Sequence, residues 1–164
     1  MKRSAGFTLL EMAITLAVLA ILSSLALPSL GLRHERQRLQ YAAETLASDI
    51  AEARFEAARR GQALHVQALV GTPGCWAVAT APDCGCDQKQ ACQVRRVALA
   101  DHPGVRVVEG HALRLDPVGL ADGADAATLE SPHGERLRVQ VTRMGRPHVC
   151  VSAGAAAWPR MPAC

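Results

Sequence analysis

The sequence has few aromatic residues and almost no lysine. Phe, Trp and Tyr make up 3% of the 164 residues, which argues against an aromatic platform for stacking single-stranded nucleic acid. Lysine occurs only at Lys2 and Lys89, so arginine supplies nearly all of the positive charge. The net charge of +3 is too small to hold a polyanion by bulk attraction. Any affinity for nucleic acid must therefore come from a local patch.

Motifs of the common enzyme classes are also missing. The chain contains no glycine loop that would cradle a phosphate, no nucleophile elbow and no His-x-x-Glu-His metal motif. Its histidines are scattered singly along the chain, at His34, His65, His102, His111, His133 and His148. The sequence therefore predicts a protein that is not an enzyme, with no metal, no cofactor and no small-molecule substrate.

Charge is absent from one long segment near the N-terminus. No charged residue occurs from Met12 to Leu32, and most positions there are Leu, Ala, Ile or Val. A helix of this length rises roughly 32 Å, enough to cross the hydrocarbon core of a bilayer. A secretory signal peptide and an ordinary membrane anchor are the simpler interpretations. However, Glu11 lies at the start of the apolar segment, where a carboxylate is costly unless it is neutralised or paired.

The residues around Glu11 carry a resemblance to a known signal. Lys2-Arg3-Ser4-Ala5-Gly6-Phe7-Thr8-Leu9-Leu10-Glu11 closely resembles the class III signal of type IV prepilins and type II secretion pseudopilins. The resemblance implies that a membrane peptidase cuts after Gly6 and methylates Phe7. It also implies that Glu11 pairs with the N-terminal amine of a neighbouring subunit, which would neutralise the buried carboxylate. We therefore expect a cleaved leader at 1–6, a transmembrane and filament-core segment at 7–32, and a periplasmic head at 33–164.

The apolar periodicity continues beyond the membrane segment. One helical stripe is formed by positions three and four apart: Leu39, Ala43, Leu46, Ile50, Ala53 and Ala57. Gly61 is a suitable C-terminal cap, so we expect a single helix from Phe7 to Arg60.

After Gly61 the pattern changes to alternation, which is typical of short strands. We expect strands at 64–70, 75–79, 95–100, 104–109, 112–115, 127–130, 135–142 and 148–151. In the segment 135–142, Leu137 and Val139 should face inward while Arg136 and Arg138 face outward. One long helix followed by many strands predicts an α+β fold, in which the second half of the helix packs on a small antiparallel sheet.

Six cysteines form an even set: Cys75, Cys84, Cys86, Cys92, Cys150 and Cys164. The Cys-x-Cys spacing at Cys84 and Cys86 lacks the two-residue spacer of common zinc knuckles, and no histidine lies within the cluster. Oxidation is expected for a periplasmic head. We therefore predict disulfides, with Cys150 paired to Cys164 and the other four paired among themselves in an order that the sequence leaves open.

Two later segments narrow the resemblance. Ala53-Arg54-Phe55-Glu56-Ala57 resembles the end of the helix in the FimT, FimU and GspH minor pilins, and Gly145-Arg146-Pro147-His148-Val149-Cys150 resembles their GRxR ending. Certain FimT-like pilins bind DNA through such a basic segment, so the resemblance makes Arg143, Arg146 and His148 candidate DNA-binding residues. Here His148 replaces the second arginine of the motif, which should weaken the binding.

The resemblance implies a structural subunit. We expect a FimT/FimU-like minor pilin that enters or primes a type IV pilus from the inner membrane. Its arginine-rich C-terminal segment is either a DNA-binding site or only a solvated edge of the last strands. A GspH-like pseudopilin of a type II secretion system is the alternative. The expected partners are a prepilin peptidase, other pilins, the inner membrane and DNA.

Overall fold

The computed structural model describes residues 8–71, 74–87, 89–154, 158 and 161–164, and in residues 25–30 it describes the backbone alone. The chain divides into two compact units, Met1–His34 and Glu35–Cys164, and the second of these is called the head below. One helix, α1 (Leu9–Arg60), contributes its first half to the first unit and its second half to the head.

The second half of α1 supplies one wall of the core of the head. All six residues of the expected stripe, from Leu39 to Ala57, are buried, as the periodicity predicted. The helix ends in a Schellman motif, because Gln62 N–H donates to the carbonyl of Ala57 and Gly61 N–H donates to that of Ala58. Gly61 adopts a φ of +63°, which explains why a glycine follows the last helical residue.

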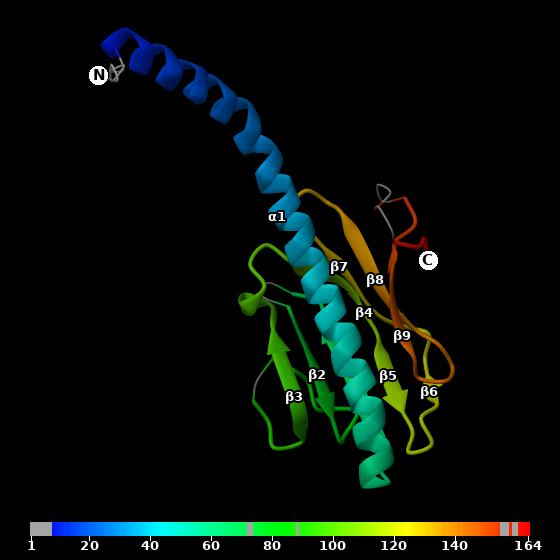
Figure 1. Ribbon diagram of the computed structural model, residues 1–164. Coiled ribbons are helices and arrows are strands. Elements are labelled where there is room, and N and C mark those ends of the chain that lie inside the picture. Colours follow the sequence, from blue (N-terminus) through cyan, green and yellow to red (C-terminus); the bar gives the residue numbers. More distant parts are fainter. Residues whose placement is uncertain (1–7, 72–73, 88, 155–157, 159–160) are drawn as a thin grey trace, which may run out of the picture. The chain divides into compact units, whose positions relative to one another are not determined.

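The strands form two antiparallel sheets where the sequence predicted one. Sheet A has the order β3-β2-β1-β5-β6 and sheet B has the order β4-β7-β8-β9. Sheet A consists of β1 (Leu64–Leu69), β2 (Cys75–Ala79), β3 (Gln93–Ala98), β5 (Ala112–Leu115) and β6 (Ala121–Asp122). Sheet B consists of β4 (Arg106–Gly110), β7 (Asp125–Glu130), β8 (Arg136–Val141) and β9 (Pro147–Val151). A 3-10 turn, η1 (Leu99–Asp101), joins β3 to β4. The α+β class is confirmed (Figure 1).

Both sheets turn one face toward α1 and share a single core. Leu64 and Val66 from sheet A, and Leu137 and Val139 from sheet B, lie in the same cluster as the stripe of α1. Arg136 and Arg138 alternate with Leu137 and Val139 along β8 and lie on the opposite face of sheet B, as expected. The head therefore has a polar outer face on sheet B.

Candidate functional site

The first turn of α1 carries the residues of the expected assembly site. Thr8 caps the helix, because its Oγ1 accepts a hydrogen bond from the backbone N–H of Glu11 at 3.2 Å. A threonine cap with a glutamate three residues later is the capping-box pattern, and it fixes where the helix begins. The Glu11 side chain is exposed. Gly6 and Phe7, the expected processing site, lie outside the described residues.

The first half of α1 is covered with exposed apolar side chains. Among the described residues they include Leu9, Leu10, Met12, Ile14, Leu16, Val18, Leu19, Ile21 and Leu22. Two of its hydroxyl groups are satisfied locally: Thr15 donates to the carbonyl of Met12 and Ser24 to that of Ile21. Within the described part of the chain, no helix has an apolar stretch that meets the requirements for crossing a membrane. The segment expected to do so, 7–32, extends into residues whose side chains are not described.

The outer face of sheet B is a ladder of paired polar side chains. In its first rung, the Glu130 carboxylate on β7 lies between Arg106 on β4 and Arg136 on β8. Arg136 Nε donates to Glu130 Oε2 at 2.5 Å, and Arg106 Nε donates to Oε1 at 3.0 Å. The Glu130 side chain is 3% exposed. Hydrogen bonds from Arg106 and then Arg136 outweigh the effect of burial and hold the pKa of Glu130 below its ordinary value.

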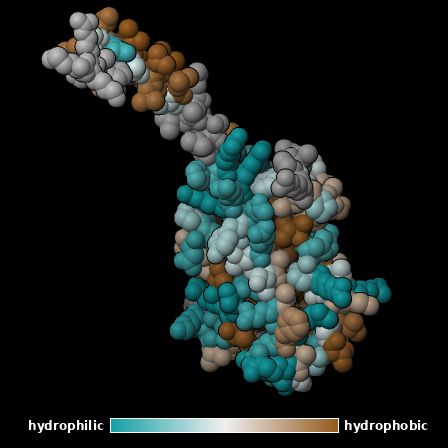
Figure 2. All heavy atoms as spheres, in the orientation of Figure 1, coloured by the Kyte–Doolittle hydropathy of each residue, from teal (hydrophilic) through white to brown (hydrophobic). Residues whose placement is uncertain are grey.

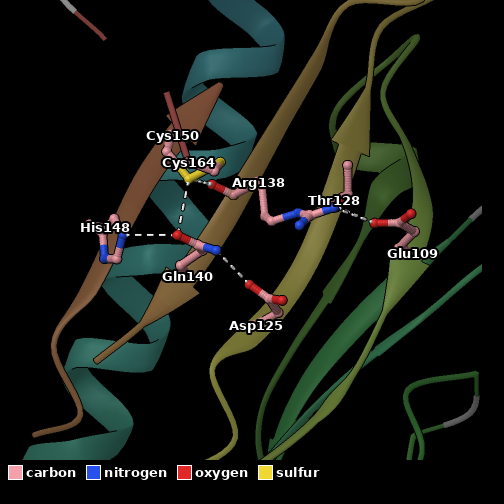
Figure 3. Close-up of a disulfide and its surroundings, with 8 residues drawn as sticks. All are labelled: Glu109, Asp125, Thr128, Arg138, Gln140, His148, Cys150 and Cys164. Carbon is pink, nitrogen blue, oxygen red and sulfur yellow. Dashed lines mark hydrogen bonds and ion pairs between the residues drawn. A yellow bond between two sulfur atoms is a disulfide. The ribbon is translucent and has the colours of Figure 1, made fainter. Parts of the chain in front are cut away.

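Two more rungs follow along the same face (Figure 3). Arg138 donates to Glu109 at 3.0 Å and to the Thr128 hydroxyl at 3.2 Å, and Thr128 donates to Glu109 at 2.8 Å. The Thr128 hydrogen bond is the main reason that the pKa of Glu109 is lowered. The third rung links Asp125, Gln140 and His148: Gln140 donates to Asp125 at 3.0 Å, and His148 Nε2 lies 3.3 Å from Gln140 Oε1. Together the nine side chains form the outer ladder: Arg106, Glu109, Asp125, Thr128, Glu130, Arg136, Arg138, Gln140 and His148.

Arg143 and Arg146 lie apart from this ladder, in the turn between β8 and β9. Both are exposed, and neither forms an ion pair with a residue that the structure describes. The turn is closed by Thr142, whose backbone N–H donates to the Arg146 carbonyl and whose hydroxyl accepts from the Arg146 N–H. Among the three DNA-binding candidates, the two arginines are thus free at the turn, whereas His148 contacts the third rung.

Arg54 packs against this turn, a contact that the sequence did not predict. Arg54 of α1 donates from Nε to the carbonyl of Gly119, in the loop between β5 and β6, at 3.2 Å. Gly145 packs against the same place: a Cβ there would lie 2.6 Å from the Gly119 carbonyl oxygen and 2.9 Å from Arg54 Cδ. Gly145 also has a φ of +67°, so both its conformation and its packing require glycine. The resemblance marked Arg54 in the sequence, but its contacts come from segments far along the chain.

All six cysteines are in disulfides. Cys150 pairs with Cys164, as predicted, and the remaining four pair as Cys75–Cys86 and Cys84–Cys92. Cys75, Ala77 and Cys86 form a small buried cluster of their own. Trp76 and Val78 from the same strand join the main core, so β2 is buried on both faces and the cysteine loop covers its outer face.

The core also contains a buried carboxylate that the sequence did not predict. Asp49 lies off the apolar stripe, yet it is buried, and its Oδ2 accepts a hydrogen bond from Trp76 Nε1 at 2.8 Å. Its Oδ1 pairs with Arg95 Nε of β3 at 2.6 Å. Burial is the main cause that raises the pKa of Asp49 above its ordinary value. A tryptophan that needs an acceptor inside the core was the available signal.

Comparison with known proteins defines the family. Residues 42–145 match the family described as type II transport protein GspH, and residues 1–27 match the prokaryotic N-terminal methylation motif. The chain therefore belongs to the GspH family, and with its N-terminal methylation motif it is a minor pilin or pseudopilin of the FimT/FimU/GspH type. This confirms the resemblance seen in the sequence.

A solved structure shows the same fold. In one crystal form, of space group P21, the type IV minor pilin FimU of Pseudomonas aeruginosa is 20% identical and has a TM-score of 0.52. This match covers 70% of this chain and 90% of FimU. The form in space group P65 is 19% identical, covers 68% and 91% of the two chains, and has a TM-score of 0.49. None of the curated proteins is similar enough in sequence to match.

Proposed function

We propose that this chain is a minor pilin that is processed at the inner membrane and assembled into a type IV pilus. Residues 1–6 are the leader, 7–32 are the membrane and filament-core segment, and 33–164 form the periplasmic head. The partners are a prepilin peptidase and other pilins, and the role is structural and not catalytic.

One observation carries this proposal: the described residues of the first half of α1 expose many large apolar side chains, and Glu11 is the one charged residue from Thr8 to Leu32. Large exposed apolar surfaces are rare in soluble proteins, and they mark contact with lipid or with other chains. The Glu11 carboxylate would be costly in either setting without a cation, and a neighbouring N-terminal amine after cleavage would supply one.

Replacing Glu11 tests the proposal. A tagged Glu11→Ala chain should insert into the membrane normally but be depleted about tenfold from sheared filaments, because the register-setting ion pair is lost. Glu44→Ala, on the exposed side of the same helix, is the control and should enter filaments like the wild type. Equal incorporation of both variants would contradict the role of Glu11. Loss of secretion with intact pili on deletion of the chain would instead support a type II secretion pseudopilin.

DNA binding at the β8–β9 turn is the second candidate function. The supporting observation is that Arg143 and Arg146 are exposed and unpaired among the described residues, while Arg136 and Arg138 are engaged in the outer ladder. Arginine binds phosphate well because its planar fork donates two parallel hydrogen bonds.

The test compares two variants that lose the same charge. Detergent-solubilised Arg143→Ala/Arg146→Ala chain should bind duplex DNA less well, and its dependence on salt should flatten by about two phosphate contacts. In the control, Arg59→Ala/Arg60→Ala, the removed arginines are those paired with Glu56 on α1. If both variants bind alike, the turn is not a DNA site.

A further inference from the structure

Four large apolar side chains are exposed around the β8–β9 turn. Phe55 comes from α1, Val118 and Leu120 from the loop between β5 and β6, and Met144 from the turn itself. They are between 50% and 79% exposed. We call these four side chains the tip surface. In Figure 1 the β6 loop and the β8–β9 turn lie side by side, and Figure 2 shows hydrophobic atoms gathered there.

The backbone beneath the tip surface is held in place. The two loops are joined by a hydrogen bond from Ala121 N–H to the Arg143 carbonyl at 3.0 Å. Arg54 and Gly145 both pack on Gly119, as described above, and the Arg54 guanidinium lies 5.9 Å from the centre of the Phe55 ring. Each of the four apolar residues is therefore adjacent in sequence to a residue that these contacts hold in place. A surface that is held in advance loses little entropy when it binds.

A hollow of about 570 Å³ opens beside Leu120, between β6 and the end of β8. Its walls are mostly apolar and come from Leu120, Ala121, Gly123, Ala124 and Val141, with Arg143 at the rim. Such a hollow suits a large apolar side chain from a partner. Scattered exposed apolar residues need no explanation, but four of them beside an apolar hollow indicate a binding surface.

The charge around the hollow indicates what the partner carries. Arg143 and Arg146 have no ion pair among the described residues, and Asp122, the one acid of the lining, faces Arg114 across the β5–β6 pair. The β8–β9 turn beside the hollow is therefore positive, and it fits an apolar side chain flanked by carboxylates. A two-fold contact between copies of this chain would bring like charges together, which disfavours a second copy as the partner.

We propose that the tip surface docks the head of a different pilin subunit, which inserts an apolar side chain into the hollow and sets a carboxylate against Arg143. This inference rests on the proposed function, because it needs the chain to be assembled beside other subunits. A protein fits better than DNA, because a nucleic acid backbone would leave Val118, Leu120 and Met144 without an apolar contact.

Photo-crosslinking of the full-length chain in its native host tests the proposal. A benzophenone amino acid at Val118 should form an adduct with a second protein that carries its own N-terminal methylation motif. The crosslinked peptide should contain Asp or Glu. Val70, also exposed but at the end of β1, is the matched control position and should give about tenfold less adduct. A probe at Leu16, on the apolar half of α1, reports assembly independently of the tip surface.

Charge reversal then tests the predicted ion pair. Arg143→Glu should lower the Val118 adduct about tenfold and Arg143→Lys should largely keep it, while Lys at the partner's carboxylate should restore the Arg143→Glu adduct. Adducts from Leu16 but not Val118 would overturn the docking surface and leave the proposed function standing. No adduct from either probe would overturn both. A Val118 adduct with DNA, with a second copy of this chain or with a protein outside the pilin class would overturn the docking proposal.

Discussion

The outer face of sheet B and the β8–β9 turn use arginine in different ways. Arg136 and Arg138 on β8 are joined to Glu130 and Glu109 from neighbouring strands. Arg143 and Arg146, a few residues later, lie beyond the end of the strand and meet no acid among the described residues. Arginines that look alike in the sequence thus divide into a group that holds strands together and a group that is available to a partner.

The difference arises from register. Antiparallel pairing sets Arg136 opposite Glu130 and Arg138 opposite Thr128. The Thr128 hydroxyl accepts a hydrogen bond from Arg138 and donates one to Glu109. Past Val141 the strand ends, and neither Arg143 nor Arg146 forms an ion pair with a residue that the structure describes. Changes on the outer ladder should therefore lower stability and spare binding, and changes to the side chains of Arg143 and Arg146 should do the opposite.

Loss of the disulfide on β9 should have the largest effect on stability. Cys150 and Cys164 are 14 residues apart in sequence, and removing a bond of this separation costs about 3 kcal/mol. We expect Cys150→Ser/Cys164→Ser to lower the free energy of unfolding by that amount in denaturant titrations without reductant. DNA binding and the Val118 adduct should be unchanged. A loss of binding without a loss of stability would contradict the division between the two regions.

Removing the Glu130 carboxylate should have the next largest effect. Glu130→Ala leaves Arg106 and Arg136 without their shared acceptor, and we expect it to cost about 2 kcal/mol, because both arginines are half exposed and can be hydrated. The control is Glu52→Ala, whose ion pair with Arg95 is long, at 3.6 Å, and exposed, so it should cost less than about 0.5 kcal/mol. Equal effects in thermal unfolding would show that the first rung adds nothing.

A methyl group added at Gly145 should disrupt the packing of the β8–β9 turn against Gly119 and Arg54. Gly145→Ala and Gly134→Ala both force alanine into a positive φ, but a Cβ at Gly134 meets nothing within 4 Å. We expect Gly145→Ala to cost about 1 kcal/mol more than Gly134→Ala, because it alone collides with Gly119 and Arg54. It should also reduce the Val118 adduct, which Gly134→Ala should leave intact.

The smallest expected effect is on the response to acid. Because the pKa of Glu130 is lowered in the folded head, its ion pairs stabilise the fold fully above pH 4.5, the ordinary pKa of glutamate, and this stabilisation is lost as the pH falls further. Between about pH 5 and pH 3, Glu130→Gln should therefore lose less stability than the wild type. Asp49→Asn should lose more, because the raised pKa of Asp49 makes its protonation favour the folded state. Identical slopes for the three proteins would refute both assignments.

Local patterns predicted much of the fold. The stripe of α1, the limits of β2 and β5, and the inward and outward faces of β8 follow from periodicity and turn residues alone. The short β6 was missed, because two residues cannot show an alternating pattern. The division into two sheets was missed because it depends on pairing between strands that are distant in the sequence.

The same limit applies to the candidate site. The sequence could not separate Arg136 and Arg138 from Arg143 and Arg146 by their partners, because the acids that pair with the first two lie on β4 and β7. The pairing of Cys75 with Cys86 and of Cys84 with Cys92 was open for the same reason. Arg54 was visible as part of a family motif, but its contact with Gly119 could be found only in the folded head.

The mass of the N-terminal peptide of the chain recovered from its native host tests the central claim most directly. If the chain is a processed pilin subunit, the mature protein begins at a methylated Phe7, and a Gly6→Val chain accumulates with Met1 still present. A mature chain that keeps Met1, or that is cut after the apolar segment as a secretory signal would be, would contradict the account.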